Sequence, residues 1–398
     1  MPWRFTFIAL PRGAYYNERV EISALWWPCG PAWKSPMASL HNSPSQAAFR
    51  LNLVYLILIL AGAGLRIWQF VADTSLYIDE IAVARDILKQ PVWALLTQPL
   101  SDQVAPKGFL LALKCAVWIW GPADSSLRIF ALVCALASLV LFWRIAVRLR
   151  GGAGPLALAL FAGAIPLITF GSEVKQYASD VFITVLMLWL VLDILVEPAV
   201  SLRAQWLAAI TGLFAAWFSH AGDLVIVSLA AALFWIVRRT PSRRAALVPV
   251  LSLWIVSAVA TANAARSVPG ELGAYVHRIW TPGFMPLSRA GELTTLWPWD
   301  QMKALLGGGS QASLNYPAPV LCLGLMVIGL WELWRRQREL ALCLSASVAA
   351  ALAAAAAQQY PFSDRLILFL VPIFLLALSA GIETVRRWAS FRLSLLGF

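Results

Sequence analysis

Two adjacent carboxylates, Asp79 and Glu80, stand at the start of the amphipathic stretch SLYIDEIAVARDIL, residues 75–88. Acidic side chains in this position can simply cap a helix, because they accept hydrogen bonds from its free N–H groups and complement its dipole. A positioned carboxylate can also act as a general base that takes the proton of a hydroxyl group, which accelerates a reaction by about 10²–10⁴-fold. The catalytic interpretation requires cations and a substrate site close to this stretch.

Four further polar segments interrupt the apolar sequence, and each carries residues that could serve such a site. They are APKGF with Lys107, SEVKQYASD at residues 172–180, SHAGD with His220, and YPFSDR with Arg365. In the second segment, Glu173, Gln176, Tyr177 and Asp180 recur at intervals of three and four residues, so in a helix they share one face. This pattern fits either a ligand-binding face or a hydrogen-bonded helix entrance, and Lys175 lies off the face in both cases.

The composition places these segments in a membrane protein. Of 398 residues, 60% are hydrophobic and 13% are charged, and the mean hydropathy is +0.74, whereas soluble proteins are nearer half apolar. The net charge of +11 comes from short arginine clusters between apolar runs, which the positive-inside rule explains without nucleic-acid binding. Cys115, Cys134, Cys322 and Cys343 lie in apolar runs as small core residues, so we predict neither a disulfide framework nor a zinc site.

The distribution of apolar and charged residues divides the chain into three segments. Residues 1–50 are broken by proline and charge, so we expect either a disordered or surface-lying extension or an over-extended gene start, with Met37 as the alternative first residue. Residues 51–388 form the transmembrane domain and residues 389–398 a cytoplasmic tail. The domain has two long outer loops: residues 71–125 with the acidic pair, and residues 264–315, whose Trp, Pro and Gly content predicts a folded lid on the acceptor side.

Apolar windows of about 17–25 residues predict an all-α polytopic membrane protein with about ten transmembrane helices. The windows fall near residues 51–70, 126–148, 154–171, 180–197, 204–220, 222–237, 246–263, 316–334, 340–357 and 365–385. The apolar segment 108–121 is short and contains Lys114. If it does not cross, the arginine clusters and the N-terminus fall on one side, so we expect it to lie at the outer surface as a juxtamembrane helix. The polar segments then share the outer face.

The order of these elements resembles a known family. An outer Asp-Glu after the first span, APKGF before a juxtamembrane helix, EVKQYASD at the start of a span, and a closing DRLILFLVP look like the protein O-mannosyltransferase and lipid A aminoarabinose transferase (ArnT-like) group of GT-C glycosyltransferases. The resemblance covers residues 50–385. APKGF departs from the family pattern, because one proline precedes its lysine where the family often has Lys-Pro-Pro.

The resemblance implies a bacterial inner-membrane enzyme with its active site facing outside. It would transfer a hexose or pentose from a polyprenyl-phosphate donor to an acceptor in a single, inverting displacement, with Asp79 as the base and Glu80 orienting Asp79 or the sugar hydroxyls. Arg365 matches the family's terminal arginine, and the residues themselves add Lys175, Lys107 and Arg85 as candidate phosphate ligands and Tyr177, Asp180, Glu173 and His220 as candidate sugar or acceptor ligands. The alternatives are an interfacial lysine for Lys107, a solvated cation for Arg85 and a satisfied polar side chain for His220. The partners are the polyprenyl donor, the bilayer and an acceptor that could be a protein, lipid or polysaccharide.

Other classes of function stay open at this point. A polyprenyl-lipid transporter or flippase would carry polar groups at mid-membrane depth and repeated broken helices, and a non-catalytic assembly protein would not need acids and cations on one side. No cofactor is expected, although in a metal-assisted variant Asp79, Glu80 and Asp102 could bind a divalent cation. The sequence leaves open the sugar, the acceptor, the polyprenol length and the oligomeric state.

Reporter fusions test the predicted topology. A fusion at residue 123 should report the outside and one at residue 242 the cytoplasm, because the segment 108–121 is predicted not to cross. A cytoplasmic signal from residue 123 would contradict the topology and move the acidic pair to the other membrane face.

Overall fold

Every regular element in the described residues is a helix, as the sequence predicts. The computed structural model describes residues 44–72, 75–98, 100, 103–196, 201–239, 244–265, 270–286 and 296–395. The chain divides into a unit of residues 1–47 and a unit of residues 48–398, and the fold described below is that of the second unit. The extension expected at residues 1–50 lies almost entirely outside the described residues.

Five of the described helices are long and apolar enough to cross a membrane. They are α1 (Pro44–Val71), α5 (Asp124–Ala146), α8 (Tyr177–Val196), α15 (Arg338–Ala356), and α16 (Val371–Leu395) with the preceding 3₁₀ helix η4 (Asp364–Leu370). A sixth candidate is α6 (Ala153–Ala162) with α7 (Ile165–Thr169) and η1 (Phe170–Ser172), which are bent by 56°. The protein is therefore an integral membrane protein, while the total of about ten spans stays a prediction.

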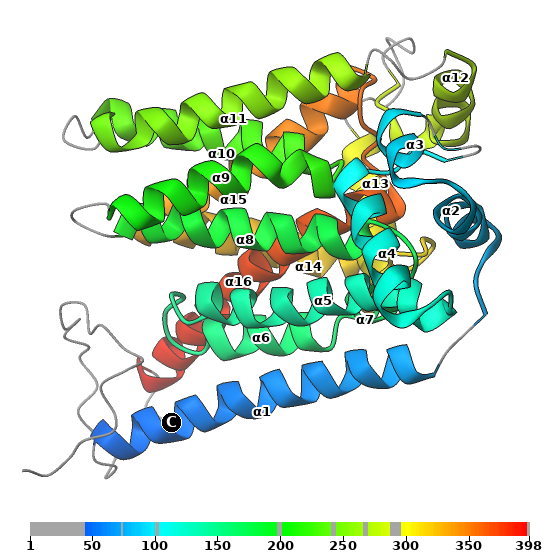
Figure 1. Ribbon diagram of the computed structural model, residues 1–398. Helices are drawn as coiled ribbons and strands as arrows, with labels where there is room; N and C mark the ends of the chain where they lie inside the picture. Colours follow the sequence, from blue (N-terminus) through cyan, green and yellow to red (C-terminus); the bar gives the residue numbers. More distant parts are fainter. Residues whose placement is uncertain are drawn as a thin grey trace, which may run out of the picture. The chain divides into compact units, whose positions relative to one another are not determined.

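Four further helices run beside these in Figure 1. They are α9 (Leu202–Phe218), α10 (Gly222–Arg239), α11 (Arg244–Ala265) and α14 (Pro319–Arg336). Each overlaps one of the predicted apolar windows. They are not among the five long apolar helices, so their crossing of the membrane stays a prediction.

A layer of short helices lies at one end of the long helices (Figure 1). It consists of α2 (Ile78–Lys89), α3 (Val92–Thr97), α4 (Lys107–Trp120), α12 (Gly270–Ile279), η3 (Thr281–Gly283) and α13 (Trp297–Gly307). We call this end of the molecule the α4 end and the opposite end the distal end. Helix α4 lies across the ends of the long helices (Figure 1), as expected for a segment that does not cross the membrane. The described parts of the 264–315 loop contain helices, as expected for a folded lid.

Two lysines on α4 hold the neighbouring short helices by their C-terminal carbonyl groups. The ammonium group of Lys114 donates to the carbonyl oxygens of Ile87 at 2.6 Å and Gln90 at 2.9 Å, at the end of α2. Lys107 donates in the same way to Leu95 at 2.9 Å and Gln98 at 2.6 Å, at the end of α3. Because the last carbonyls of a helix have no partner within the helix, both lysines satisfy acceptors and fix the helices to α4.

The sequence predicts that the apolar face of α2 lies on the membrane, and the structure buries part of that face inside the protein. The sequence pattern suggests one apolar face that includes Ile81, Ala84, Ile87 and Leu88. In the structure Ala84 and Ile87 are buried, whereas Ile81 and Leu88 are about half exposed. Glu80 on the same helix is only 1% exposed, so it needs hydrogen-bond partners in the interior of this layer.

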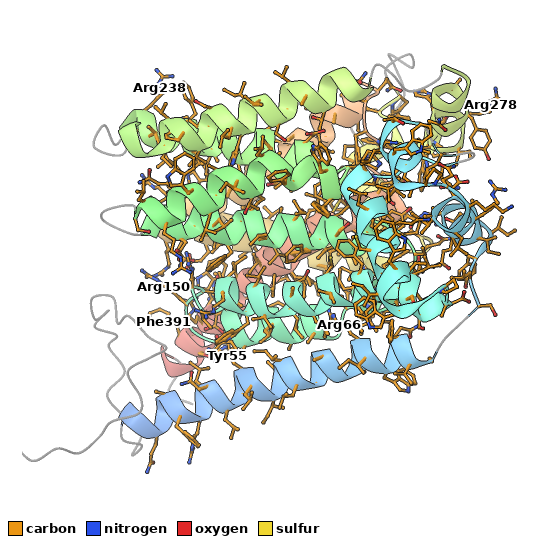
Figure 2. All side chains as sticks on the ribbon, viewed as in Figure 1. Tyr55, Arg66, Arg150, Arg238, Arg278 and Phe391 are labelled. Atoms are coloured by element: carbon orange, nitrogen blue, oxygen red, sulfur yellow. The ribbon has the colours of Figure 1, made fainter. Side chains whose placement is uncertain are left out.

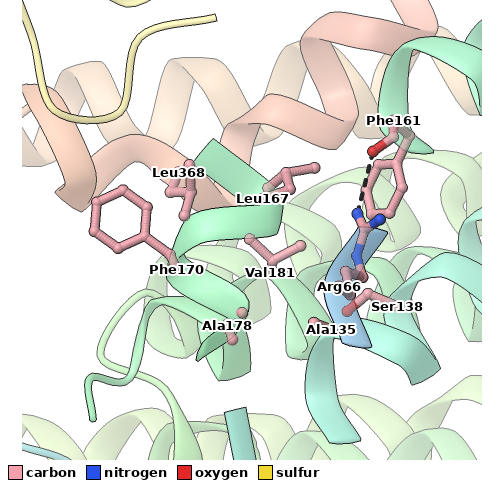
Figure 3. A pocket seen from close by; sticks show the side chains of 10 residues that line it. Arg66, Ala135, Ser138, Phe161, Leu167, Phe170, Ala178, Val181 and Leu368 are labelled. Carbon is pink, nitrogen blue, oxygen red and sulfur yellow. Dashed lines mark hydrogen bonds between the residues drawn. The ribbon is translucent and has the colours of Figure 1, made fainter. Parts of the chain in front are cut away.

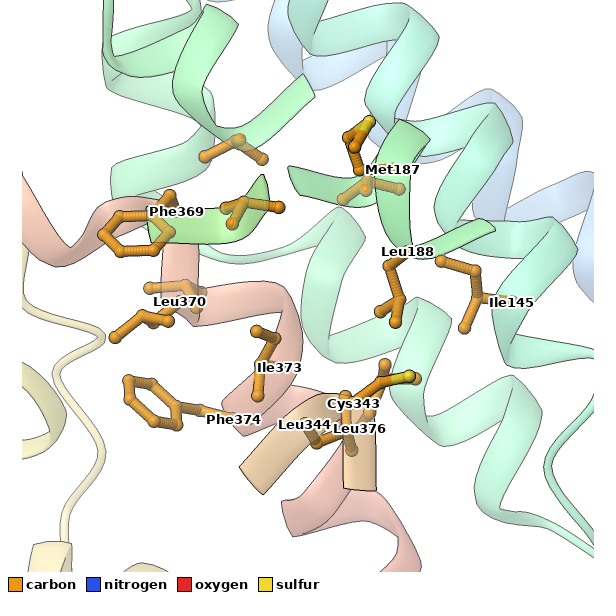
Figure 4. Close-up of a cluster of buried hydrophobic side chains, with 14 of the residues drawn as sticks. Ile145, Met187, Leu188, Cys343, Leu344, Phe369, Leu370, Ile373, Phe374 and Leu376 are labelled. Carbon is orange, nitrogen blue, oxygen red and sulfur yellow. The ribbon is translucent and has the colours of Figure 1, made fainter. Parts of the chain in front are cut away.

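A continuous apolar core surrounds α8. In Figure 4, Leu188 of α8 lies beside Ile145 of α5, and Cys343 of α15 lies beside Leu376 of α16, and all four are buried. In the most apolar windows of α8 and α16, 78% and 89% of the residues are buried, against 11% in α1, so α1 lies at the periphery. Cys134 is buried as predicted, but Cys115 is exposed, because it lies on the outer side of α4.

Helices α14 and α16 approach each other through glycines. A Cβ atom on Gly329 would overlap the carbonyl oxygen of Ala377, and one on Gly381 would overlap that of Leu325. Small residues allow helix backbones in membranes to pack this closely. The contact matters for the site, because α16 continues directly from η4, which begins with the DRLILFL segment.

The glycine contact predicts a position-specific loss of stability. Gly329→Ala should lower the melting temperature of the purified protein, because the added methyl group must push α14 and α16 apart, and overpacking costs about 1–3 kcal/mol. Gly324→Ala is the matched control on the same helix, since its Cβ would meet no atom within 4 Å. Equal melting temperatures for the two variants in a thermal-unfolding assay would refute close packing at Gly329.

Candidate active site

The two members of the acidic pair have different surroundings, and Glu80 is bound within the structure. One oxygen of Glu80 accepts a hydrogen bond from the backbone N–H of Val174 at 2.6 Å, and the other accepts one from Tyr77 at 2.9 Å. The N-terminus of α2 is thereby joined to the loop that precedes α8. Since Glu80 is buried and both of its oxygens accept backbone hydrogen bonds, the geometry favours the orienting role over contact with a sugar.

Asp79 lies between two cations from distant parts of the chain. Its Oδ2 is 3.3 Å from Nζ of Lys175 and 3.1 Å from Nη1 of Arg365. The side chain of Asp79 is 28% exposed, although its Oδ2 is itself buried, and Lys175 is only 5% exposed. The structure thus brings together three residues that the sequence assigned to one site from three separate segments.

Two glutamines complete the surroundings of these cations. The side-chain oxygen of Gln103 accepts a hydrogen bond from Lys175 at 3.1 Å, and that of Gln311 accepts one from Arg365 at 3.2 Å. Neither glutamine was predicted, because a single polar residue in a loop carries no spacing signal. Each holds its cation beside Asp79 without adding negative charge.

Arg365 also lies between two aromatic rings. Its guanidinium carbon is 5.6 Å from the ring centre of Tyr177 on α8 and 5.6 Å from that of Trp280 in the lid, a geometry that stabilises a cation. Neighbouring Asp364 does not pair with it: its carboxylate accepts the backbone N–H of Ala312 at 2.9 Å. The described part of the 264–315 loop therefore contributes to the site through Trp280, Gln311 and Ala312, while its role as a lid on the acceptor side stays a prediction.

Glu173 adds a third carboxyl group to the site. Burial raises the pKa of Glu173 to about 7, and the neighbouring carboxylate of Glu80 adds to this effect. Burial lowers the pKa of Lys175, while its ion pair with Asp79 opposes that change. At pH 7 the site therefore contains one carboxylate held by cations and one carboxyl group near the midpoint of its titration.

Four predicted ligands lie away from Asp79 or are engaged elsewhere. Lys107 holds the end of α3, and Arg85 is 42% exposed and 3.8 Å from Asp86 on its own helix. Asp180 is 3% exposed and lies against the Ser219 hydroxyl and the N–H groups of residues 220 and 221, at the N-terminus of α10. Burial lowers the pKa of His220 to about 4, so this ring is neutral. The helix-entrance interpretation fits Asp180 and His220 better than sugar binding.

The described residues contain no group of three or more His, Cys, Asp or Glu side chains that could hold a metal ion. Asp102, one of the three ligands considered for a divalent cation, lies outside the described residues. The metal-assisted variant therefore stays a prediction.

A small apolar pocket lies between α1, α5, α6, α7, α8 and η4 (Figure 3). Its lining residues come from several helices: Arg66, Ala135, Ser138, Phe161, Leu167, Phe170, Gly171, Ala178, Val181 and Leu368. Phe170 also packs edge-on against Tyr177, with ring centres 5.1 Å apart. Arg66 is buried and donates to the carbonyl oxygens of Phe161 and Ala162 at 3.2 Å, which satisfies acceptors at the bend between α6 and α7.

No protein-family model and no curated protein sequence matches the chain. Among solved structures, the chain is similar to the crystal structure of ArnT from Cupriavidus metallidurans bound to undecaprenyl phosphate. The match covers 89% of this chain and 63% of that chain, with 14% sequence identity and a TM-score of 0.48. This chain therefore spans less than two thirds of that protein's length. The likeness falls within the group that the sequence resembles, and it concerns the fold alone.

The two hydrogen bonds to Glu80 predict a structural phenotype. Glu80→Gln should lower the melting temperature, because an amide has only one oxygen and leaves one buried N–H group without an acceptor, at a cost of about 1–3 kcal/mol. Glu339→Gln removes an exposed carboxylate from α15 and serves as the control. If the two variants unfold at the same temperature, Glu80 does not stabilise the contact between α2 and the loop that contains Val174.

Proposed function

We propose that the protein is a membrane glycosyltransferase that moves a sugar from a polyprenyl-phosphate donor to an acceptor hydroxyl. The observation that carries the proposal is the placement of Asp79 within 3.3 Å of both Lys175 and Arg365. A base, two cations and an adjoining apolar pocket are the groups that this reaction requires. With the predicted topology, the site faces the outside of the bacterial inner membrane.

The two cations fit the phosphate of the donor. Arg365 can bind two phosphate oxygens with its planar guanidinium group, and Lys175 supplies a point charge. The rings of Tyr177 and Trp280 and the oxygen of Gln311 restrict the orientation of Arg365. Such preorganised charges stabilise the negative charge that develops on the leaving phosphate.

Asp79 fits the role of general base. The acceptor oxygen would attack the anomeric carbon, the bond from that carbon to the phosphate oxygen would break, and the leaving group would keep the electron pair. The hydroxyl proton would pass to Asp79. One displacement inverts the anomeric centre and needs no covalent intermediate.

Binding of the donor would also free the base. In the structure both cations contact the same oxygen of Asp79, so that oxygen is engaged and not directed at a hydroxyl group. A phosphate competes with Asp79 for Lys175 and Arg365. The carboxylate oxygen would then be released toward the acceptor hydroxyl only when the donor is present, which would limit reaction with the wrong hydroxyl.

The pocket in Figure 3 supports a lipid-linked donor. Leu368 lies one turn after Arg365 in η4, and Phe170 contacts Tyr177. The apolar lining therefore begins where the cation site ends. The cavity holds only about 10 Å³, roughly the room of one water molecule, so its walls would have to move apart for an isoprene unit to enter while the phosphate contacts Arg365.

Mass spectrometry of surface glycans from cells with and without the gene tests the function. The proposal expects the loss of one sugar from one glycan, which would identify both substrates. In parallel, the purified protein should bind polyprenyl phosphate, and Lys175→Gln should weaken that binding. Unchanged glycans together with transbilayer movement of a polyprenyl lipid would instead favour a flippase.

Replacement of Asp79 distinguishes a general base from a residue that only supports the start of α2. Asp79→Asn should lower transfer by about 10²–10⁴-fold, because an amide cannot accept the hydroxyl proton, while Asn supports a helix start about as well as Asp. The melting temperature and the binding of polyprenyl phosphate should be retained. Near-normal transfer by the purified variant would exclude Asp79 as the base.

Arg365→Lys tests recognition of the phosphate by the planar guanidinium group. The variant keeps the positive charge but loses the planar group that can bind two phosphate oxygens. We therefore expect the rate of transfer to fall by about ten-fold or more, which corresponds to the loss of a charge-assisted hydrogen bond of ~1–3 kcal/mol. Arg338→Lys is a control on the exposed start of α15. Normal turnover in both Arg365→Lys and Arg365→Ala would leave Arg365 with a structural role.

A further inference from the structure

Arg365 belongs to the α4 end of the molecule, away from the arginines of the distal end. Figure 2 shows Arg278 of α12 at the α4 end and Arg238 of α10 at the distal end. Trp280 follows Arg278 by two residues, and its ring centre lies 5.6 Å from the guanidinium carbon of Arg365. The aromatic rings and Gln311 restrict the end of the Arg365 side chain, whereas the direction in which that side chain enters the site depends on the backbone.

The backbone turns sharply at Asp364, immediately before Arg365. Asp364 has a left-handed conformation, with a φ angle of 50°. Residues other than glycine rarely adopt this conformation, although aspartate and asparagine do so more readily than most. The turn lies where the extended backbone of Ser363 passes into η4. It therefore sets the direction in which Arg365 leaves the chain.

The side chain of Asp364 joins this turn to the loop of residues 308–315. Its carboxylate accepts the backbone N–H of Ala312 at 2.9 Å, and Ala312 is fully buried. The side-chain oxygen of the preceding residue, Gln311, accepts a hydrogen bond from Arg365 at 3.2 Å. Two adjacent residues of η4 thus bond to two adjacent residues of the loop, so the positions of Gln311 and Arg365 are coupled.

The 308–315 loop depends on such contacts because its sequence imposes little conformation. It begins with Gly308 and Gly309, whose φ angles of 115° and 99° are open to glycine but rarely to other residues. At the other end of the loop, Leu314 donates its backbone N–H to the last turn of α13 at 2.7 Å. Between the glycines and Leu314, the loop backbone is held by the carboxylate of Asp364.

A tyrosine holds the chain on the other side of Arg365. The hydroxyl group of Tyr360 donates to the carbonyl oxygen of Leu366 at 2.9 Å. The backbone N–H of Leu366 donates to the carbonyl oxygen of Ser363 at 3.2 Å. These two bonds do not involve the side chain of Asp364. Loss of the Asp364 carboxylate should therefore shift Arg365 without unfolding the start of η4.

We propose that Asp364 is a positioning residue for Arg365, the arginine assigned to the donor phosphate. The inference rests on the proposed function. The left-handed turn at Asp364 aims Arg365 at the site, and the carboxylate of Asp364 fixes the loop that carries Gln311. Asp364 acts through these two residues and not by contact with either substrate, because its carboxylate is bonded to the backbone of Ala312.

Variants of Asp364 separate the effect of the backbone from that of the carboxylate. Asp364→Gly keeps the left-handed conformation but removes the carboxylate, so it should lower sugar transfer by about ten-fold, the effect of one hydrogen bond to a charged group. Asp364→Asn should retain most of the activity, because its amide oxygen can accept the N–H of Ala312 and asparagine tolerates this conformation.

Asn315→Gly is the matched control for these variants. Asn315 also has a left-handed backbone, with a φ angle of 54°, but its side chain bonds to Ser313 within the same loop. The control should transfer sugar at the wild-type rate.

Combination with an Arg365 variant distinguishes positioning from a general loss of structure. Binding of decaprenyl phosphate to the purified full-length protein in detergent is measured by calorimetry for wild type, Asp364→Gly, Arg365→Ala and the double variant. Asp364→Gly should weaken binding on its own. It should have no further effect once Arg365 is alanine, because no guanidinium group remains to be positioned. Arg238→Gln, at the distal end, should bind like wild type.

Wild-type transfer and binding by Asp364→Gly would overturn the inference. So would an equal loss of binding from Asp364→Gly with and without Arg365, or a loss of activity in Asp364→Asn as large as that in Asp364→Gly. If the wild type bound decaprenyl phosphate no better than Arg365→Ala, the proposed function would fail together with the inference. Arg365-dependent binding that Asp364→Gly leaves unchanged would overturn the inference alone.

Discussion

The carboxylate of Asp79 connects three parts of the chain that are far apart in sequence. Lys175 reaches it from the loop before α8, and Arg365 reaches it from the start of η4. Charged groups beside a membrane are costly unless they are paired, so the surrounding helices must place these partners within hydrogen-bonding reach. The α4 layer, the lid and the α14–α16 contact are all needed to meet this condition.

Helix α4 shows how the layer of short helices fixes its members in place. The sequence predicts a short surface helix here because Lys114 interrupts an apolar run, and the structure has α4 across the helix ends. Lys114 makes its contacts only in the tertiary structure, since its partners are carbonyl groups at the end of α2. Neither spacing nor composition reveals such partners, which is why Lys107 was assigned to a phosphate although it holds α3 in the same way.

The site itself could be predicted only in part. Asp79, Lys175 and Arg365 were found because charged residues are rare in this sequence and share one predicted membrane face. The common helical face of Tyr177 and Asp180 did not reveal that one residue would contact Arg365 and the other the start of α10. The neutral partners Gln103, Gln311 and Trp280 gave no pattern at all, because their role exists only once the loops are folded together.

The charges at the proposed site suit the whole reaction, and not only its first step. A polyprenyl phosphate sugar is a phosphodiester with one negative charge, which together with ionised Asp79 balances Lys175 and Arg365. When the sugar leaves, the phosphate gains a second negative charge, and Asp79 loses its own by accepting the proton. The net charge of the phosphate, Asp79, Lys175 and Arg365 is therefore unchanged, so the protein need not stabilise an excess charge at the membrane surface. Glu173 preserves this balance while it is protonated, and with a pKa of about 7 it adds an uncompensated charge as the pH rises above neutral.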